Sequence, residues 1–510
     1  MRLVITCLLL AIAAADDIRW GIVVDCGSTG SRVHIYSWSA FTPIREFTPP
    51  TPEDEALLHA TPGISTFANR PHDAAAYFAP LLVQAARWVP PAAAAATLVR
   101  ALATAGMRLL SEEEQAPIWT SITEAISSSS FAVGGSMTLA GEYEGIFNWL
   151  SIQYILGGSA SDATHGGLDL GGASTQITFR PTSGVIVQDA YRLVVNATTT
   201  RLYSHSYMRS GADQARIRLA QLIADRDGSS APRKALANPC ANLGLDVNYT
   251  LTCATPGGPT PCDRLLVGAG NHAACRVLTD ALLNRANECL LPPCAAHGAY
   301  QPSPASVLFY AVSGYFYTAN SLGLLGWDDE RSLSAAQIAT AGGEWCAQNW
   351  SSVAGQYRSG VCFSSAYIPS LLAAYGIARD DASAVTYARK IHGFSASWAL
   401  GAQLYFIQEM KCAIEAAGAP SGGQCAPPDA RLPRMEMGVS VLGIPTALAL
   451  GGFVGVAVGS RRLRCAWPSK ADFARRPNGI ANVALRDDLS DPEVSAVSNG
   501  NAAHFGSNSV

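Results

Sequence analysis

Two short segments of this 510-residue chain repeat one pattern, in which an Asp ends an apolar run and Gly, Ser and Thr follow. The first segment is DCGSTGSR, beginning at Asp25, and the second is DLGGASTQ, beginning at Asp169. Backbone N–H groups of Gly-rich turns bind phosphate oxygens, and Ser and Thr hydroxyls add further donors. A carboxylate at a strand end can hold a divalent cation directly or through its waters. The pair of segments therefore predicts a polyphosphate site with Ca²⁺ or Mg²⁺ as cofactor.

The sequence around each segment predicts the elements that position it. Each Asp follows an apolar, strand-like run and precedes an alternating one, which predicts a β-hairpin in each copy. Helical periodicity occurs at 74–89, 118–126, 145–156 and 397–410, and more weakly at 384–393 around Tyr387. We therefore expect an α/β fold of two similar lobes, each presenting one hairpin to a cleft between them.

Hydrolysis of a phosphate also requires an activated water. Glu142 and Glu144 provide carboxylates in a glycine-flanked turn just before an apolar helical stretch. Acidic residues are favoured in the first turn of a helix because of the helix dipole. Helix capping is a sufficient explanation for Glu142. For Glu144, the residues alone leave both helix capping and catalysis open.

Two apolar stretches predict where the protein is located. Residues 1–15 combine Arg2, an apolar run and small residues, which is typical of a cleaved secretory signal peptide. A buried N-terminal helix or a signal anchor is the alternative. Residues 437–459 are uncharged, and 23 helical residues reach about 34 Å, enough to cross a bilayer. The basic RRLR that follows is typical of a cytoplasmic flank. We expect a single-pass membrane protein of the secretory pathway, with a lumenal or extracellular body and a disordered cytosolic tail at 460–510.

The cysteines and sequons agree with that location. Of 13 cysteines, Cys7 lies in the signal, Cys465 on the cytosolic side and Cys26 within the first Asp segment. The other ten all lie beyond residue 239, and an even set predicts disulfides in an oxidising compartment. Sequons predict glycosylation at Asn196, Asn248 and Asn349.

The composition argues against a nucleic-acid partner. Charged residues make up 15% of the chain and the net charge is −4. Nucleic-acid binders show a basic excess or a basic stripe, and this chain has neither.

Four segments, in this order, resemble the signature regions of the apyrases, the nucleoside triphosphate diphosphohydrolases: VVDCGSTGSRVHIY, ATAGMR, AGEYEGIFNWLSIQYILG and GGLDLGGASTQITF. The resemblance covers residues 20–410, and the form DCGSTGSR is most similar to the Golgi and endomembrane branch. It implies two ribonuclease-H-like lobes of the actin and sugar-kinase type. It also implies stepwise hydrolysis of nucleoside tri- and diphosphates to monophosphate and orthophosphate, with Ca²⁺ or Mg²⁺.

The resemblance also implies roles for individual residues. Glu144 would be the general base, and Ser174 and Gln176 would position the water. Asp25 and Asp169 would hold the water shell of the metal. Further residues would line the phosphate cleft: Ser28, Thr29, Gly30, Ser31, Thr104, Gly171, Gly172 and Ala173, while Arg108 would line or brace it. Tyr317 would stack on the base, with an ordinary core aromatic as the alternative.

Three positions depart from the cell-surface relatives. Ala212 stands where they carry Arg, and Val361 where they carry Tyr. These differences leave the base preference open between a loose one and one for nucleoside diphosphates such as UDP and GDP. Arg209 stands where they carry Cys, so Cys262 needs another partner, and Cys253 is near. We therefore expect five disulfides: Cys240–Cys275, Cys253–Cys262, Cys289–Cys294, Cys346–Cys362 and Cys412–Cys425.

The expected domains are lobe I at 16–160, completed by about 395–412, lobe II at 161–394 and a stalk at 413–436. An exopolyphosphatase or phosphotransferase on the same fold is a second interpretation, against which the secretory signal, the membrane anchor and Glu144 argue. A nucleotide-binding, receptor-like protein that lacks catalysis is a third. The presence of Glu144, Asp169, Ser174 and Gln176 argues against it. The sequence leaves the oligomeric state open.

Overall fold

The computed structural model describes residues 18–39, 42–157, 165–182, 185–195, 198–227, 235–255, 258–284, 287, 289–355, 358–377 and 380–418. Met1–Met437 form one compact unit and Gly438–Val510 a second, and all described residues lie in the first. Within the described ranges no helix has the length and apolar character to cross a membrane. The predicted signal peptide, the predicted span at 437–459 and the tail lie outside these ranges.

The first sheet contains the first Asp hairpin. Its strand order is β3-β2-β1-β5-β6, with β4 paired to β2. The hairpin of β1 and β2 is antiparallel, β5 runs parallel to β1, and β6 runs parallel to β5. The bounds of these strands are β1 Arg19–Cys26, β2 Ser31–Trp38, β3 Arg45–Glu46, β4 His59–Ala60, β5 Leu98–Ala103 and β6 Ala132–Thr138.

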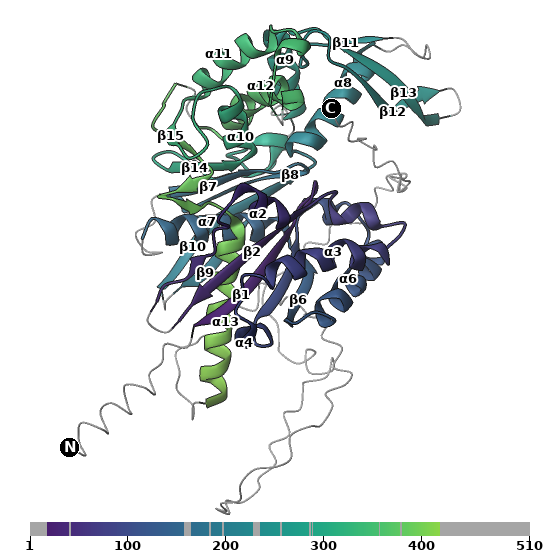
Figure 1. Cartoon of the computed structure of the whole chain (residues 1–510). Coiled ribbons are helices and arrows are strands. Elements are labelled where there is room, and N and C mark those ends of the chain that lie inside the picture. The colour runs from purple at the N-terminus through teal and green to yellow at the C-terminus, as the bar shows by residue number, and fades with distance from the viewer. Residues whose placement is uncertain are drawn as a thin grey trace, which may run out of the picture. The chain divides into compact units, whose positions relative to one another are not determined.

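Two long helices cover one face of this sheet, α3 (Asp73–Ala85) and α6 (Glu112–Ser127) (Figure 1). Their apolar faces pack with alternate side chains of β1 and β5 in one core. Ser111 begins α6 in a capping box with Glu114, which satisfies two backbone donors at the helix start. Short helices connect the strands: α2 Pro52–Leu57, η1 Ile64–Phe67, α4 Pro91–Ala94 and α5 Ala105–Arg108.

The second sheet contains the second Asp hairpin, in the order β15-β16-β14-β7-β8-β10-β9. Here β7 and β8 form the antiparallel hairpin, β10 pairs antiparallel with β8, and β14 and β16 run parallel to β7. The bounds are β7 His165–Leu170, β8 Ser174–Phe179, β9 Ala190–Val195, β10 Thr198–Met208, β14 Leu308–Ser313, β15 Glu330–Ser332 and β16 Val385–Ala388.

The two sheets share one topology. The series β3-β2-β1-β5-β6 of the first corresponds, strand for strand and direction for direction, to β10-β8-β7-β14-β16 of the second. In both sheets the strand that carries the Asp, β1 or β7, lies at the centre of this series. The fold is therefore α/β with two lobes of the same strand order, as the duplicated sequence pattern predicts.

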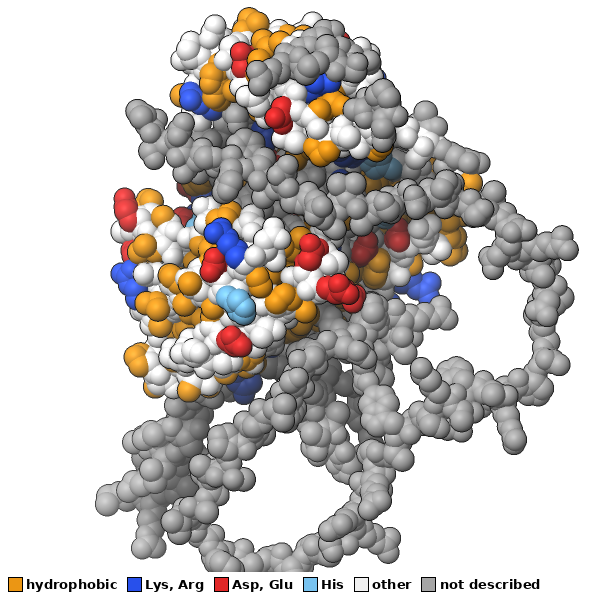
Figure 2. Space-filling view, turned by 90° about the vertical axis from the view of Figure 1, so that its right-hand side faces the viewer, with side chains coloured by type: hydrophobic (Ala, Val, Ile, Leu, Met, Phe, Trp, Pro, Cys, Tyr) orange, Lys and Arg blue, Asp and Glu red, His pale blue; other side chains and the backbone are white. Residues whose placement is uncertain are grey.

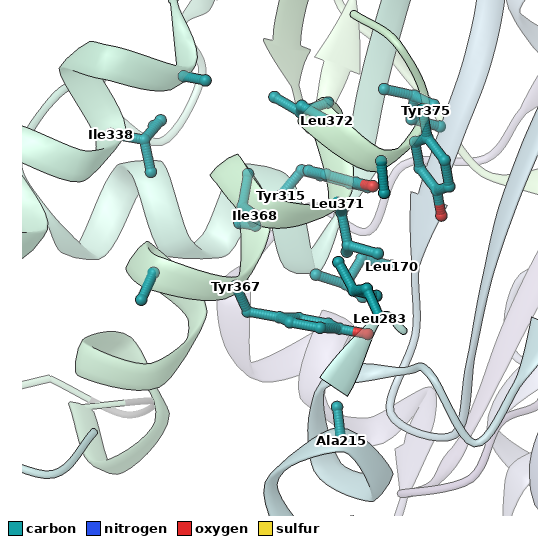
Figure 3. Close-up of a cluster of buried hydrophobic side chains, with 14 of the residues drawn as sticks. Leu170, Ala215, Leu283, Tyr315, Ile338, Tyr367, Ile368, Leu371, Leu372 and Tyr375 are labelled. Carbon is teal, nitrogen blue, oxygen red and sulfur yellow. The ribbon is translucent and has the colours of Figure 1, made fainter. Parts of the chain in front are cut away.

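Helices of the second lobe bury its largest core. Figure 3 shows Tyr315, Tyr367 and Tyr375 packed among leucines and Ile368, and all three tyrosines are fully buried. Ser334 begins α11 in a second capping box. The remaining elements of this lobe are α8 Ala212–Asp227, β11 Leu236–Asn238, β12 Asp246–Thr255, β13 Gly258–Gly268, α9 His272–Leu282, η2 Ala296–Gly298, α10 Gly314–Ser321, α11 Ala335–Cys346, η3 Trp350–Ser352, α12 Arg358–Ala374, β17 Lys390–Ile391 and β18 Phe394–Ser395.

Two helices join the lobes. α7 (Gly141–Ile155) packs against β7, β8 and β10, although it follows the first sheet in the sequence. α13 (Trp398–Gly418) packs on α7 and on β1 and β2 (Figure 1). Residues 143–153 of α7 are all buried, so this stretch of the helix has no polar face turned to solvent. Its polar residues are buried with the apolar ones: Glu144, Asn148, Ser151 and Gln153. Gly401 allows the close approach, since an added Cβ would contact the Phe147 carbonyl oxygen.

The helix expected at 384–393 is wrong. Val385–Ala388 form strand β16, which pairs with β14 and β15. Val385, Thr386 and Tyr387 are β-branched or aromatic residues, which pack well on a sheet, and Tyr387 is fully buried there. Sheet pairing and burial therefore override the weak helical periodicity.

Four disulfides hold the second lobe together: Cys240–Cys275, Cys253–Cys262, Cys289–Cys294 and Cys346–Cys362. They are four of the five pairs expected from the sequence, and the fifth involves Cys425, which lies outside the described residues. Asn248 and Asn349 are exposed, whereas Asn196 also lies outside the described residues. On the face shown in Figure 2, basic and acidic side chains are interspersed among apolar ones.

Candidate active site

The two Asp hairpins meet where their loops turn. A Cβ atom added to Gly172 would lie 2.6 Å from Ser28 Oγ and 3.4 Å from Thr29 Cγ2. Gly172 follows β7 in the second lobe, whereas Ser28 and Thr29 follow β1 in the first. Only glycine allows this approach, because it has no side chain. The loops of the two lobes thus lie side by side.

The ATAGMR segment supports the first loop from within its own lobe. The Thr104 N–H donates to the Cys26 carbonyl at 3.2 Å, and α5 begins directly after Thr104. A Cβ atom added to Gly106 would lie 2.8 Å from Ser28 Cα. Thr104 is itself buried. Ser28 is therefore fixed between a glycine of each lobe.

The loop residues differ in how accessible they are. Thr29 is exposed, Ser28 and Gly30 are half-buried, and Ser31 is 3% exposed at the start of β2. The Ser28 and Thr29 side chains can therefore reach a ligand, while Ser31 is enclosed in its lobe.

The second loop is a tight turn that leads into a helix. The Gly171 N–H donates to the Ser174 carbonyl at 3.0 Å, which closes the turn. The Gly172 carbonyl accepts from the N–H groups of Asp213 at 2.9 Å and Gln214 at 3.0 Å, in the first turn of α8. Ala173 and Ser174 are buried behind this turn. Hence Gly171 and Gly172 are the accessible part of the second loop.

Glu144 lies in the first turn of α7 with its carboxylate in a buried polar network. Its Oε2 atom accepts from Arg108 Nη2 and, at 3.1 Å, from Gln176 Nε2. Arg108 comes from α5 of the first lobe and Gln176 from β8 of the second. Because α7 packs on β8, the carboxylate lies against Gln176, whose amide also contacts Ser174.

The Gln176 amide organises this network. Its Nε2 atom lies 2.7 Å from Ser174 Oγ and 2.9 Å from Ser206 Oγ, in addition to Glu144. Arg108 donates to the same two hydroxyls, at 3.3 Å to Ser174 and 3.4 Å to Ser206. Both hydroxyls therefore accept from cationic or amide donors, and each can direct its own proton to another oxygen, such as that of a water.

Ser206 had no role in the sequence predictions. β10 pairs antiparallel with β8, and the register sets Ser206 opposite Gln176. Residues directly opposite in such a pair have adjacent side chains. In the sequence, Ser204 and Ser206 alternate within SHSY, as Gln176 and Thr178 do in the other strand. This alternation indicates a shared polar face only once the two strands are known to pair.

Three carboxylates share this buried region. Burial raises the pKa of Glu144 to about 8, against the lowering effect of Arg108, and the charges of Asp169 and Asp25 raise it further. Burial likewise raises the pKa of Asp169 to about 6, with Asp25 adding to the rise. The pKa of Asp25 is also raised by burial. The carboxylates thus destabilise one another's charged forms.

The concentration of carboxylates in this region fits a bound cation. Asp25 Oδ1 is buried without a hydrogen-bond partner, although Asp25 is the second-last residue of β1, next to the first loop. Among the described residues, no cluster of three or more His, Cys, Asp or Glu side chains is placed to hold a metal directly. Two carboxylates with water and phosphate oxygens as the remaining ligands suit Mg²⁺ or Ca²⁺. Asp25 and Asp169 are the pair that the sequence predicts for that role.

Tyr317 lies near this edge of the second sheet. β14 ends at Ser313 beside Asp169, a hydrogen bond from Ser313 lowers the Asp169 pKa, and Tyr317 follows one helical turn later in α10. The Tyr317 ring is half-buried and contacts Phe316 and Trp327, with centroids 5.6 and 6.0 Å away. Val361 is 2% exposed, so it offers no surface to a ligand.

The fold and the site together define an α/β phosphate-binding protein with two duplicated lobes. A crystal structure of nucleoside triphosphate hydrolases from Neospora caninum has this fold, with a TM-score of 0.58 and 14% sequence identity, covering 80% of this chain and 96% of that one. Residues 11–419 match the GDA1/CD39 (nucleoside phosphatase) family. The chain belongs to this family.

Curated relatives carry several names. Probable apyrase 3 of Arabidopsis thaliana is 30% identical over 407 residues, covering 76% of this chain and 82% of that protein. Ectonucleoside triphosphate diphosphohydrolase 8 of Bos taurus is 31% identical over 422 residues, covering 76% and 82%. Guanosine-diphosphatase of Saccharomyces cerevisiae is 28% identical over 449 residues, covering 79% and 83%. These similar identities confirm the apyrase resemblance, and the narrower branch remains a prediction.

Proposed function

We propose that this chain hydrolyses nucleoside tri- and diphosphates to the monophosphate and orthophosphate. The observation that carries the proposal is the network in which Arg108 and Gln176 bond the Glu144 carboxylate and also contact the hydroxyls of two serines, Ser174 and Ser206. It lies next to two Gly-rich loops that face each other, and the relatives named above support the substrate class.

In the proposed mechanism the loops hold the phosphates and the network prepares the water. Backbone N–H groups of residues 28–30 and of Gly172, with the Ser28 and Thr29 hydroxyls, bind the phosphate oxygens from opposite sides. Ser174 and Gln176 orient a water, and Glu144 accepts its proton as the oxygen attacks the terminal phosphorus. The proton moves from the water to Glu144 Oε1 or Oε2, the water oxygen bonds the terminal phosphorus to give orthophosphate, and the remaining nucleotide leaves with the electron pair of the bridging P–O bond. No covalent enzyme intermediate is needed.

Asp25 and Asp169 would hold a Ca²⁺ or Mg²⁺ through its waters, and the cation would neutralise developing charge on the phosphates. Arg108 serves a separate purpose. Its guanidinium favours the ionised form of Glu144, since it lowers the pKa that burial raises. A carboxylate with a pKa near the working pH is suited to general-base catalysis.

The same proposal covers location. The disulfides require an oxidising compartment, and the chain's patterns at 1–15 and 437–459 supply a signal and an anchor, so the catalytic unit would face the lumen or the exterior. Glycans at Asn248 and Asn349 would be accommodated because both side chains are exposed. Protease protection of intact membrane vesicles would test this topology.

The deciding experiment is phosphate release by the full chain, purified in detergent after expression through a secretory pathway. ATP, ADP, UDP and GDP are assayed with Ca²⁺, with Mg²⁺ and with EDTA. Metal-dependent release from both di- and triphosphates is the expected result, and the ranking of bases would define the branch. Nucleotide binding without release would favour a receptor-like protein, and release from polyphosphate alone would favour an exopolyphosphatase.

A further inference from the structure

We propose that Trp327, held in place by Arg389, forms a second aromatic surface for the nucleobase beside Tyr317. This inference rests on the proposed function and names a specificity residue for the same site. Trp327 lies in the connection between α10 and β15, outside every sequence segment that suggested a role in catalysis or binding.

The sheet topology places Arg389 at the edge that carries the site. β7, β14 and β16 run parallel, with Asp169 opposite Val312 and Ala311 opposite Tyr387. Their carboxyl ends therefore share one edge of the sheet, where ligands bind in open α/β sheets. Arg389 follows the last residue of β16. Two strand spacings, about 10 Å, separate the end of β16 from that of β7.

Arg389 fixes Trp327 through several contacts at once. The guanidinium carbon lies 4.7 Å from the indole centroid, and Nε donates to the Trp327 carbonyl at 3.2 Å. Nη2 donates to Asp328 Oδ1 at 2.7 Å, and Lys390 Nζ lies 3.1 Å from the same oxygen. The Arg389 side chain is only 18% exposed. Cation–π stacking and these polar contacts pre-organise the indole rather than leaving it to rotate.

The indole itself remains available to a ligand. Trp327 is 50% exposed, whereas the Phe316 ring beside it is fully buried. The Trp327 and Tyr317 rings lie 6.0 Å apart and tilted by 37°. Tyr317 is one helical turn from Ser313, which lies beside Asp169, so the two rings lie near the sheet edge that carries the phosphate site. Aromatic rings stack on any base and so tolerate several nucleotides.

The test compares the full-length wild type with Trp327→Ala, Trp327→Phe and a control, Trp88→Ala. Trp88 also stacks with an arginine, Arg87 at 5.2 Å, but lies ahead of α4 and β5 in the first lobe. KM and kcat are measured with GDP, UDP and pyrophosphate, which lacks a base. Binding of GDP in EDTA is followed separately by isothermal titration calorimetry, and thermal melting checks folding.

Trp327→Ala should raise KM and weaken binding for GDP and UDP by about 10- to 100-fold, the usual effect of losing one base–aromatic stack. The kcat and the pyrophosphate kinetics should stay near wild type, Trp327→Phe should recover most of the loss, and Trp88→Ala should change none of these values. Unchanged nucleotide KM in Trp327→Ala, or an equal loss with pyrophosphate, would overturn the inference. A wild type without turnover refutes the proposed hydrolysis, and the calorimetry then still decides the role of Trp327.

Discussion

Arg108 Nη2 donates to Glu144 Oε2, and this ion pair joins the last residue of α5 to the first turn of α7. Both side chains are largely buried, at 12% and 7% exposure. Buried pairs of this kind hold their partners in one geometry, because leaving either charge unpaired is costly. The pair also connects the segments ATAGMR and AGEYEG, whose paired residues are 36 positions apart in the sequence.

The first prediction concerns the base. Glu144→Gln should lower kcat by about 10²- to 10⁴-fold, because the amide cannot accept the proton of the water. Nucleotide binding, measured by calorimetry, should stay near wild type. Glu142→Gln is the matched control, two residues away in the same helical turn, and should keep its turnover. Near-normal turnover in Glu144→Gln would refute the mechanism.

Ser206→Ala tests the residue that only the structure identified. The substitution removes the hydroxyl that accepts from Gln176 and Arg108, so both lose part of their positioning. Losing a buried hydrogen-bond partner costs about 1–3 kcal/mol, which corresponds to a fall in kcat of about 5- to 150-fold. KM should change little.

Ser204→Ala is the comparison for that variant, because Ser204 lies on the same face of β10 but bonds Thr178 and the Glu142 carbonyl. It should leave kcat close to wild type. Equal losses in both variants would indicate a general disturbance of the strand rather than positioning of the water.

The cation prediction concerns the two aspartates. EDTA should abolish phosphate release, and Asp25→Asn and Asp169→Asn should each raise the Ca²⁺ or Mg²⁺ concentration for half-maximal rate by at least about tenfold, since each removes a charged ligand group. Asp73→Asn, at an exposed ion pair with Arg70, should not shift it. A cation dependence that is the same in all three variants would contradict the assignment.

The pH dependence follows from the position of Glu144. A general base works only when deprotonated, so kcat should fall as the pH drops below the pKa of Glu144, which burial raises to about 8 without a cation. The charges of Asp25 and Asp169 contribute to that rise. A bound cation offsets those charges, so the acid limb of the profile should lie at lower pH with saturating than with limiting Ca²⁺. A limb that does not move would contradict this account.

The disulfides should contribute unequally to stability. Cys240–Cys275 closes a loop with a sequence separation of 35, and Cys253–Cys262 one of only 9. In the chain-entropy model the longer loop is worth about 1 kcal/mol more. Replacing Cys240 and Cys275 by Ala should lower the Tm more than replacing Cys253 and Cys262. The reverse order in calorimetric melting would show that the entropic argument fails here.

Local patterns determined much of this protein in advance. Glycine, serine and threonine after an apolar run define a phosphate-binding turn through backbone geometry, and the sequence contains that pattern at Asp25 and again at Asp169. The shared strand order of the two sheets follows from this repeat. Helix periodicity likewise located α3, α6, α7 and α13, because each contains apolar residues at helical spacing. α6 nevertheless begins six residues before the expected 118, and α13 ends eight residues after the expected 410.

Only the tertiary structure decided the rest, because it depends on contacts between segments far apart in the chain. The packing of α7 on the second sheet brings Glu144 to Gln176, and the register of β10 on β8 sets Ser206 opposite that glutamine. Pairing with β14 and β15 likewise made 385–388 the strand β16 rather than part of a helix, and Arg389, the next residue, stacks on the Trp327 ring. No spacing in the sequence encodes these distances, since side-chain packing and sheet register set them.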